Sequence, residues 1–165
     1  MQSLGVDALY INMLEEISYL LNLKATGQHE FDPLFNSSLL LISTGDSYKL
    51  KLYIDDSIYD QTSGFFKQKA IQGLDVSKQS NLEVEMREVK VKKVGIDVQS
   101  CSQAVYELFK EKEIEVKELS GKDLPVSSLK VLKNVTEIDG LRQAYIRESA
   151  ALISVYAKIR KTIET

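Results

Sequence analysis

The carboxyl-terminal stretch from Leu129 to Thr165 constrains the fold most, because it joins a helix-start signal to a long helical period. Asn134 can cap a helix by accepting from the free N–H groups of its first turn, and Glu137 follows three residues later, as in a capping box. The apolar residues then recur mostly three or four positions apart, at Ile138, Leu141, Tyr145, Leu152, Val155, Tyr156, Ile159 and Ile163. We predict one amphipathic helix from about Asn134 to Ile163.

The length of this helix carries a second prediction. At about 1.5 Å per residue it would extend for roughly 45 Å, more than a compact domain of this size needs. Gly140 costs about 1 kcal/mol relative to Ala, which suggests close packing against a neighbour. We call the recurring apolar residues of this helix the stripe. Its distal part has no obvious core to cover, so we predict that it forms an interface with another domain or with a second copy of the chain. Its residues are Leu152, Val155, Tyr156, Ile159 and Ile163.

The rest of the chain alternates strand-like and helix-like segments. Apolar runs and period-two alternation predict strands at 8–11, 39–44, 48–54, 82–86, 93–97 and 114–119. Helical spacing predicts helices at 13–21, 60–74, 100–112 and 126–132, the last opened by Pro125. The turn Gly45-Asp46 predicts a hairpin between the second and third strands. We therefore predict an α/β domain with a central mixed β-sheet flanked by helices, spanning residues 1–132, followed by a long C-terminal linker helix at 133–165.

Composition excludes several classes of protein. The 21 basic and 24 acidic residues give a net charge of −3 with no basic block, so nucleic acid is not an expected partner. No apolar run reaches the roughly 18 residues of a membrane span, so no membrane partner is expected. Cys101 is the only cysteine, which excludes an internal disulfide and favours a reducing compartment. We predict a cytoplasmic protein.

Two blocks of the sequence resemble a known family. Lys133-Asn134, Glu137-Ile138, Gly140-Leu141-Arg142, Ala144 and Ile146-Arg147 are similar to the linker of Xaa-Pro aminopeptidases (aminopeptidase P), in the creatinase/prolidase superfamily. That linker reads approximately K-N-x-x-E-I-x-G-M-R-x-A-H-I-R-D. This chain has Leu141, Tyr145 and Glu148 in place of Met, His and Asp, and these changes leave the helix intact.

The amino-terminal part carries the second block. Residues 7–23, Phe31-Asp32-Pro33-Leu34-Phe35 and Tyr53-Ile54-Asp55 resemble the corresponding segments of the same family. Lys24 stands where the family has Arg, and a lysine lacks the rigid two-pronged fork of a guanidinium. Lys24, His29 and Asp32 are our candidates for residues that line a substrate cleft. For His29, a loop position without a catalytic part is the favoured interpretation, and a place in the cleft is the alternative.

The resemblance implies a creatinase N-terminal-like, ribonuclease-H-like fold, most like the middle domain of three-domain aminopeptidase P. Such a domain is non-catalytic, supports dimerisation and walls the active-site cleft. The parent enzyme would remove an N-terminal residue that precedes proline from short proline-containing peptides. Two divalent metal ions, manganese in this family, would lie in a catalytic domain after Thr165. No catalytic residue, metal ligand or cofactor is expected in this chain, and its own catalytic domain and a homodimer are the expected partners.

Two other classes remain open. A peptidase-like binding module of a pseudo-enzyme, such as the large subunit of a histone chaperone, would share the fold. A standalone nuclease could bind magnesium through Asp55, Asp56 and Asp97, which follow predicted strands. His29 is the only histidine, so a zinc cluster or a Ser-His-Asp arrangement is poorly supported. Cys101 begins a predicted helix, whose positive end could lower the pKa of the thiol.

Overall fold

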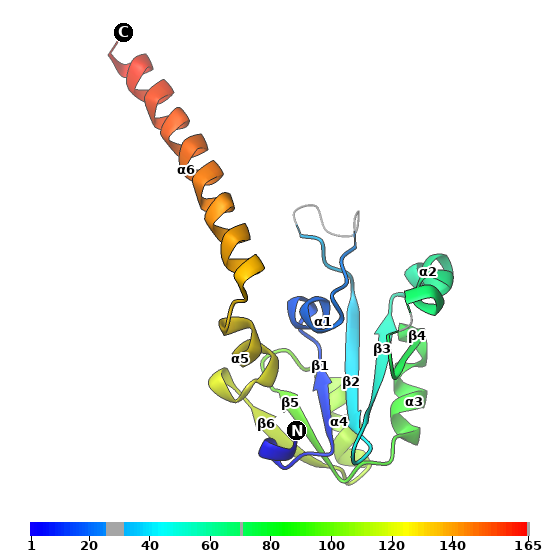
Figure 1. Cartoon of the computed structure of the whole chain (residues 1–165). Coiled ribbons are helices and arrows are strands. Elements are labelled where there is room, and N and C mark those ends of the chain that lie inside the picture. Colours follow the sequence, from blue (N-terminus) through cyan, green and yellow to red (C-terminus); the bar gives the residue numbers. More distant parts are fainter. Residues whose placement is uncertain (26–31, 70, 165) are drawn as a thin grey trace. The chain divides into compact units, whose positions relative to one another are not determined.

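Six strands form one mixed sheet in the order β4-β3-β2-β1-β5-β6 (Figure 1). The computed structural model describes residues 1–25, 32–69 and 71–164. The strands are β1 (Ala8–Ile11), β2 (Ser37–Ser43), β3 (Tyr48–Ile54), β4 (Leu74–Lys78), β5 (Lys93–Asp97) and β6 (Glu115–Leu119). Strand β2 runs antiparallel to β1 and β3, whereas the pairs β3/β4, β1/β5 and β5/β6 are parallel. The predicted mixed sheet is confirmed.

Helices cover both faces of this sheet. They are α1 (Leu14–Leu21), α2 (Asp56–Lys69), α3 (Leu82–Glu88), α4 (Gln103–Glu111), α5 (Pro125–Val131) and α6 (Val135–Ile163), with short 3-10 turns at Gln2–Leu4, Gln79–Asn81 and Gly121–Asp123. One core cluster joins the sheet to α1, α2 and the start of α5, and the other joins it to α3 and α4. Because it is covered on both sides, β1 is buried at all four positions, as its continuous apolar run predicts.

The predicted strand at 82–86 is wrong, because these residues form helix α3. Leu82 and Met86 are both buried while Val84 between them is 63% exposed. Positions i and i+4 share one face of a helix, and alternating residues share one face of a strand. A five-residue apolar-polar alternation satisfies both patterns, so this segment was too short to distinguish them.

The predicted helix at 60–74 is displaced in the structure. Helix α2 begins at Asp56, directly after Asp55, whose Oδ1 accepts from the backbone N–H of Ser57 at 2.9 Å. The chain then turns at Gly73, with φ +72°, and enters strand β4. Strand β4 was not predicted, since Leu74 was assigned to the end of the helix. The left-handed backbone of Gly73 is the local reason that the helix cannot continue there.

The remaining elements are confirmed with small shifts at their ends. The hairpin pairs Ser43 with Tyr48, and the turn contains Gly45 at φ +87°. Helix α4 begins after Ser102, whose Oγ accepts from the N–H of Val105. Helix α5 opens at Pro125, as predicted.

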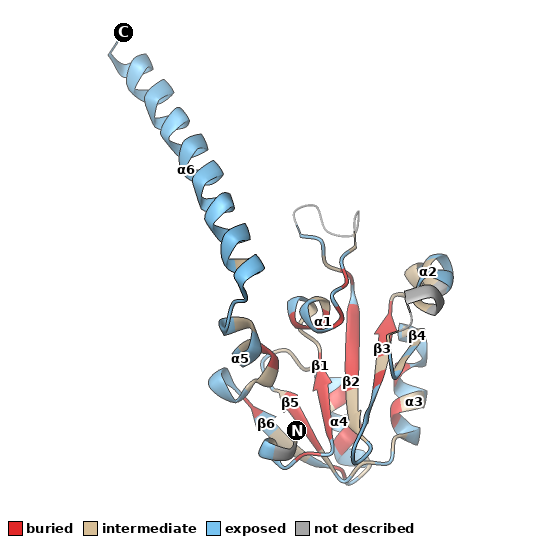
Figure 2. Ribbon diagram, in the orientation of Figure 1, coloured by how far each residue is buried: buried red, intermediate tan, exposed pale blue. Residues whose placement is uncertain are grey.

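The chain divides into two compact units, Met1–Ser128 and Leu129–Thr165. We call the first unit the body and the second the tail. The body holds the sheet and both core clusters, and the tail consists mainly of α6. Figure 2 shows the buried residues within the body and the exposed residues along α6.

Candidate functional site

Helix α6 starts where the sequence predicts, because its first turn satisfies its own backbone donors. Asn134 Oδ1 accepts from the N–H of Glu137 at 2.9 Å, and Glu137 Oε2 accepts from the N–H of Asn134 at 2.8 Å. This reciprocal pair is a complete capping box. It uses only residues of the tail, so the start of α6 is defined locally.

The apolar stripe of α6 is exposed along its whole length. Ile138, Tyr145, Leu152 and Ile159 recur every seven residues, and their exposed fractions lie between 37% and 64%. No residue of α6 is buried. The five predicted interface residues are all among the exposed large apolar side chains: Leu152, Val155, Tyr156, Ile159 and Ile163. Exposed apolar patches commonly mark binding surfaces, and the interface role of these five residues stays a prediction.

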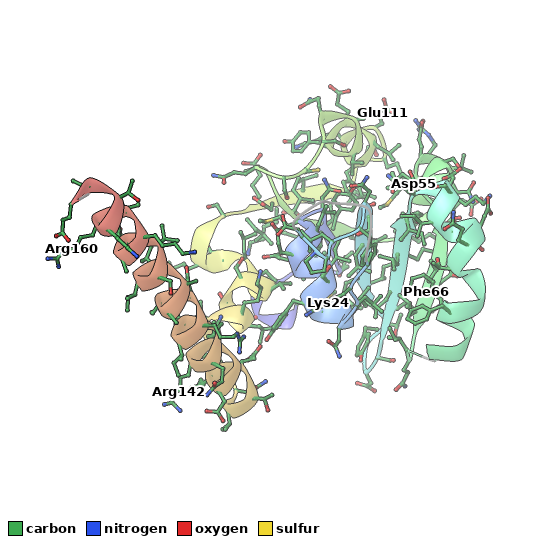
Figure 3. The ribbon with its side chains drawn as sticks, turned by 90° about the horizontal axis from the view of Figure 1, so that it is seen from above. Lys24, Asp55, Phe66, Glu111, Arg142 and Arg160 are labelled. Atoms are coloured by element: carbon green, nitrogen blue, oxygen red, sulfur yellow. The ribbon has the colours of Figure 1, made fainter. Side chains whose placement is uncertain are left out.

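Several polar side chains of α6 have partners on the helix itself. Arg142 pairs with Asp139 at 3.2 Å and Arg160 with Glu164 at 2.7 Å, and both arginines extend outward from α6 (Figure 3). Ser154 Oγ donates to the carbonyl of Ala150 at 2.8 Å. These contacts satisfy part of the polar surface of α6 within the helix, whereas no side chain of its apolar stripe is buried among the described residues.

The prediction that Gly140 packs closely against a neighbour is wrong for the described residues. A Cβ placed at Gly140 would meet no atom within 4 Å beyond the local helix backbone. Gly140 is exposed on α6 and has no positive φ. Neither crowding nor backbone geometry within the described residues requires a glycine there.

Two of the three substrate-cleft candidates lie at the two described ends of the chain that flank residues 26–31. Lys24 and Asp32 are both exposed, and the Ala25 N–H donates to the Pro33 carbonyl at 3.1 Å, which brings the ends together. The side chain of Lys24 is labelled in Figure 3. His29 lies outside the described residues. The role of all three in a cleft stays a prediction.

The carboxylates proposed for a nuclease lie apart and have structural partners. Strands β2 and β1 separate β3 from β5, so about three strand spacings of 4.8 Å separate Asp55 from Asp97. Hydrogen bonds from the side chain and backbone of Ser57 hold the pKa of Asp55 below its usual range. Asp97 Oδ1 accepts from the N–H of Gln99 at 3.1 Å. These contacts favour turn and helix capping over a shared metal ion.

The chemistry of Cys101 and of metal binding is also limited. Burial and the nearby Asp97 carboxylate raise the pKa of the Cys101 thiol to about 11. The thiol therefore stays protonated at neutral pH, contrary to the idea that a helix end activates it. Ser102, not Cys101, caps α4.

Within the described ranges, no group of three or more His, Cys, Asp or Glu side chains could hold a metal ion.

A crevice at the carboxyl ends of β1 and β5 was missed by sequence reasoning. The chain leaves β1 for α1 on one face and β5 for α4 on the other, which makes this a topological switch point. Asn12, Glu16 and Asp97 line it, together with Pro125 and Val126 of α5. Its cavity of about 20 Å³ has room for roughly one water molecule. It is too small for a peptide side chain.

A second hollow lies between α3 and α4, with a volume of about 200 Å³. Leu82, Val105 and Leu108 line its apolar part. Arg87 crosses it, pairing with Glu83 at 2.9 Å and with Glu111 at 3.3 Å. The sequence did not predict this hollow, because residues 82–86 were assigned to a strand and the hollow forms between two helices.

The sheet and its helices define an α/β domain with an exposed apolar stripe on α6, and comparisons with known proteins identify its family. The chain belongs to the creatinase/prolidase N-terminal domain family, whose sequence model matches residues 1–137. It is 30% identical over 166 residues to Xaa-Pro aminopeptidase 1 of Dictyostelium discoideum, covering 99% of this chain and 24% of that protein. The chain thus spans about a quarter of the length of this curated relative.

Solved structures agree on the fold. An Xaa-Pro dipeptidase from Bacillus anthracis superposes with a TM-score of 0.57 at 17% identity, covering 84% of this chain and 35% of that one. The N-terminal domain of the cytoplasmic peptidase PepQ from Mycobacterium tuberculosis superposes with a TM-score of 0.52 at 22% identity, covering 78% and 90%. Among the described helices, none combines the length and apolar character needed to cross a membrane.

Proposed function

We propose that this chain is a non-catalytic domain of a Xaa-Pro aminopeptidase, most like the middle domain of the three-domain form. One observation carries the proposal: nearly the whole chain aligns with a Xaa-Pro aminopeptidase while covering 24% of that protein. The remaining three quarters of such a protein leave ample length for a catalytic domain. The single cysteine supports a cytoplasmic location for the parent.

The parent reaction would be hydrolysis of the bond between an N-terminal residue and proline. Two divalent metal ions, manganese by family resemblance, would supply the water-activating chemistry in that enzyme. The described residues offer no suitable group of ligands. We therefore assign no hydrolytic step to this chain, and its roles are to wall the cleft, through Lys24 and Asp32, and to support a homodimer.

The stripe of α6 is the proposed contact with the catalytic domain. A large apolar side chain gains about 1.5–3 kcal/mol when it moves from water into a packed interface. Leu152, Val155 and Ile159 lie on one side of the helix at half exposure, so docking would bury them together. The alternative occupant is a second copy of α6, since the seven-residue spacing also suits a coiled coil.

The activity proposal is tested by comparing the isolated chain with the full-length gene product. Both are assayed on a short peptide with proline in the second position, with and without Mn²⁺. We expect cleavage by the full-length protein alone. Cleavage by the purified chain would contradict the non-catalytic role, and an inactive full-length protein that binds peptides would favour the pseudo-enzyme alternative.

The docking proposal is tested on the stripe itself. Leu152→Glu and Ile159→Glu should each weaken binding of the chain to the separately produced remainder of the protein at least about tenfold, because a charge cannot be buried unpaired. Ser154→Glu adds the same charge on the opposite side of α6 and should leave binding unchanged. Equal effects of all three variants would exclude the stripe as the contact. A doubled mass in light scattering that Leu152→Glu abolishes would instead indicate pairing of two copies.

A further inference from the structure

Glu16 is the only buried residue among the Asp, Glu, Lys and Arg residues that the structure describes, with 5% of its surface exposed. Burying a carboxylate is costly unless it is paired or hydrogen-bonded, so such a residue requires an explanation. It is the third residue of α1, where the positive end of the helix favours a negative charge. The helix end offsets part of this cost but does not explain why a carboxylate is used.

The partner of Glu16 lies far along the chain. Ser127 Oγ donates to Glu16 Oε1 at 2.6 Å, across 111 residues. This distance is in the range of a hydrogen bond from a hydroxyl to an ionised oxygen, the stronger class of hydrogen bond. Glu16 therefore connects α1, near the start of the body, with α5, near its end.

Ser127 occupies the last stretch of chain that belongs to the body. Val126 before it is 3% exposed within the core cluster that also holds α1. Ser128 after it donates through Oγ to the carbonyl of Lys122 at 3.0 Å. The body ends at Ser128. Val126, Ser127 and Ser128 each make one of these contacts. Only the hydrogen bond between Ser127 and Glu16 joins α5 to a distant helix through a charged group.

The crevice at the switch point also supports the interpretation that Glu16 connects α1 with α5. In α/β sheets this position commonly holds a ligand. Here its wall is formed by Leu124, Pro125 and Val126, and the cavity has room for about one water. The carboxylate of Glu16 is thus directed to α5 and not to a substrate-sized space.

We propose that Glu16 is a positioning residue that fixes the first turn of α5 to the body and thereby sets where the body ends. Without it, the ordered end of the body would retreat toward Val126, which is held separately in the core. This role concerns the exit of the chain from the body and does not depend on the proposed enzymatic function.

Hydrogen exchange of the full chain tests the proposal. Glu16→Ala and Ser127→Ala should each accelerate exchange of the amides at 128–131 by about tenfold or more, because each removes the same charge-assisted bond. Exchange in α4 should stay unchanged. Glu15→Ala, on the exposed neighbour of Glu16, is the matched control and should leave α5 as it is.

Two further variants distinguish a local effect of Glu16 on α5 from a general loss of stability of the body. Glu16→Gln keeps an acceptor without the charge and should restore only part of the protection lost in Glu16→Ala. The double variant Glu16→Ala with Ser127→Ala should exchange no faster in α5 than the faster single variant, because both lose one shared bond. Unchanged α5 exchange in both single variants would overturn the proposal. So would an equal acceleration of α4 and α5, which would show that Glu16 serves the whole body alike.

Discussion

In the body, side chains stabilise one another across a sheet, whereas in the tail each turn of α6 is stabilised by residues of the same helix. Leu52 is fully buried between two cross-strand neighbours, and Leu152 is 52% exposed. The body's structure depends on long-range burial, and the structure of α6 on a capping box and on pairs three or four residues apart. A helix that is stabilised by its own residues, as α6 is, stays folded while one of its faces remains available for binding.

The largest difference should appear when the same residue type is truncated in both units. Leu52→Ala should lower the free energy of unfolding by about 2–5 kcal/mol, because it leaves a cavity in the core. Leu152→Ala should change it by less than about 0.5 kcal/mol, because an exposed side chain leaves no cavity. Urea unfolding followed by circular dichroism measures both. A loss above about 2 kcal/mol for Leu152→Ala would show that α6 is packed in the isolated chain.

Glycine replacements should act in opposite directions in the two units. Gly73→Ala should cost the body about 1–3 kcal/mol, because the residue has φ +72° and its new Cβ would lie 2.8 Å from the Tyr48 carbonyl oxygen. Gly140→Ala should instead stabilise α6 by about 0.5–1 kcal/mol, since Ala is the better helix former and the space is open. Thermal unfolding and helical ellipticity at 222 nm report the two effects. If Gly140→Ala stabilises the chain but weakens binding to the rest of the parent, the glycine serves the interface.

Loss of the helix cap should affect the tail alone. Asn134→Ala removes the acceptor for the Glu137 N–H and should cost the first turn of α6 about 1 kcal/mol. Hydrogen exchange at 135–138 should become faster while β1 and β5 remain protected. Asn134→Ser keeps an acceptor and should restore most of the protection. Faster exchange in the sheet would mean that the two units do not unfold separately.

The smallest expected effect is a pH dependence in the body. Burial opposes ionisation of Glu85, but hydrogen bonds from Lys51 at 2.8 Å and from Ser77 outweigh it and hold its pKa below the ordinary 4.5. Because the folded-state pKa is the lower one, this stabilisation is complete above pH 4.5 and is lost as the pH falls through the folded-state value. Glu85→Gln should flatten the acid limb of the stability profile by less than about 1 kcal/mol. An unchanged acid limb would show that other carboxylates control it.

Sequence reasoning succeeded where short-range chemistry determines the structure. The cap at Asn134, the apolar run of β1 and Pro125 at the start of α5 each depend on residues a few positions apart. It failed at 82–86, where one helical and one strand pattern coincide, and at β4, where the turn at Gly73 was not recognised.

The candidate site divides in the same way. The apolar residues that α6 exposes were predicted one by one, because a periodic surface is visible in one segment, and their role as an interface stays a prediction. The bond between Glu16 and Ser127 spans 111 residues, and nothing local specifies the partner. The apolar period of α1 did not mark Glu16 either, because Leu20, four residues after it on the same side of the helix, is exposed.

The capping box of α6 also has a thermodynamic consequence for association. Fixing one residue of a disordered segment costs about 1–2 kcal/mol, and a segment that folds on binding meets that cost during association. Asn134 and Glu137 order the first turn of α6 without a partner. A surface that is already helical gives up little further conformational entropy when it is covered, so a modest apolar area can support a tight contact.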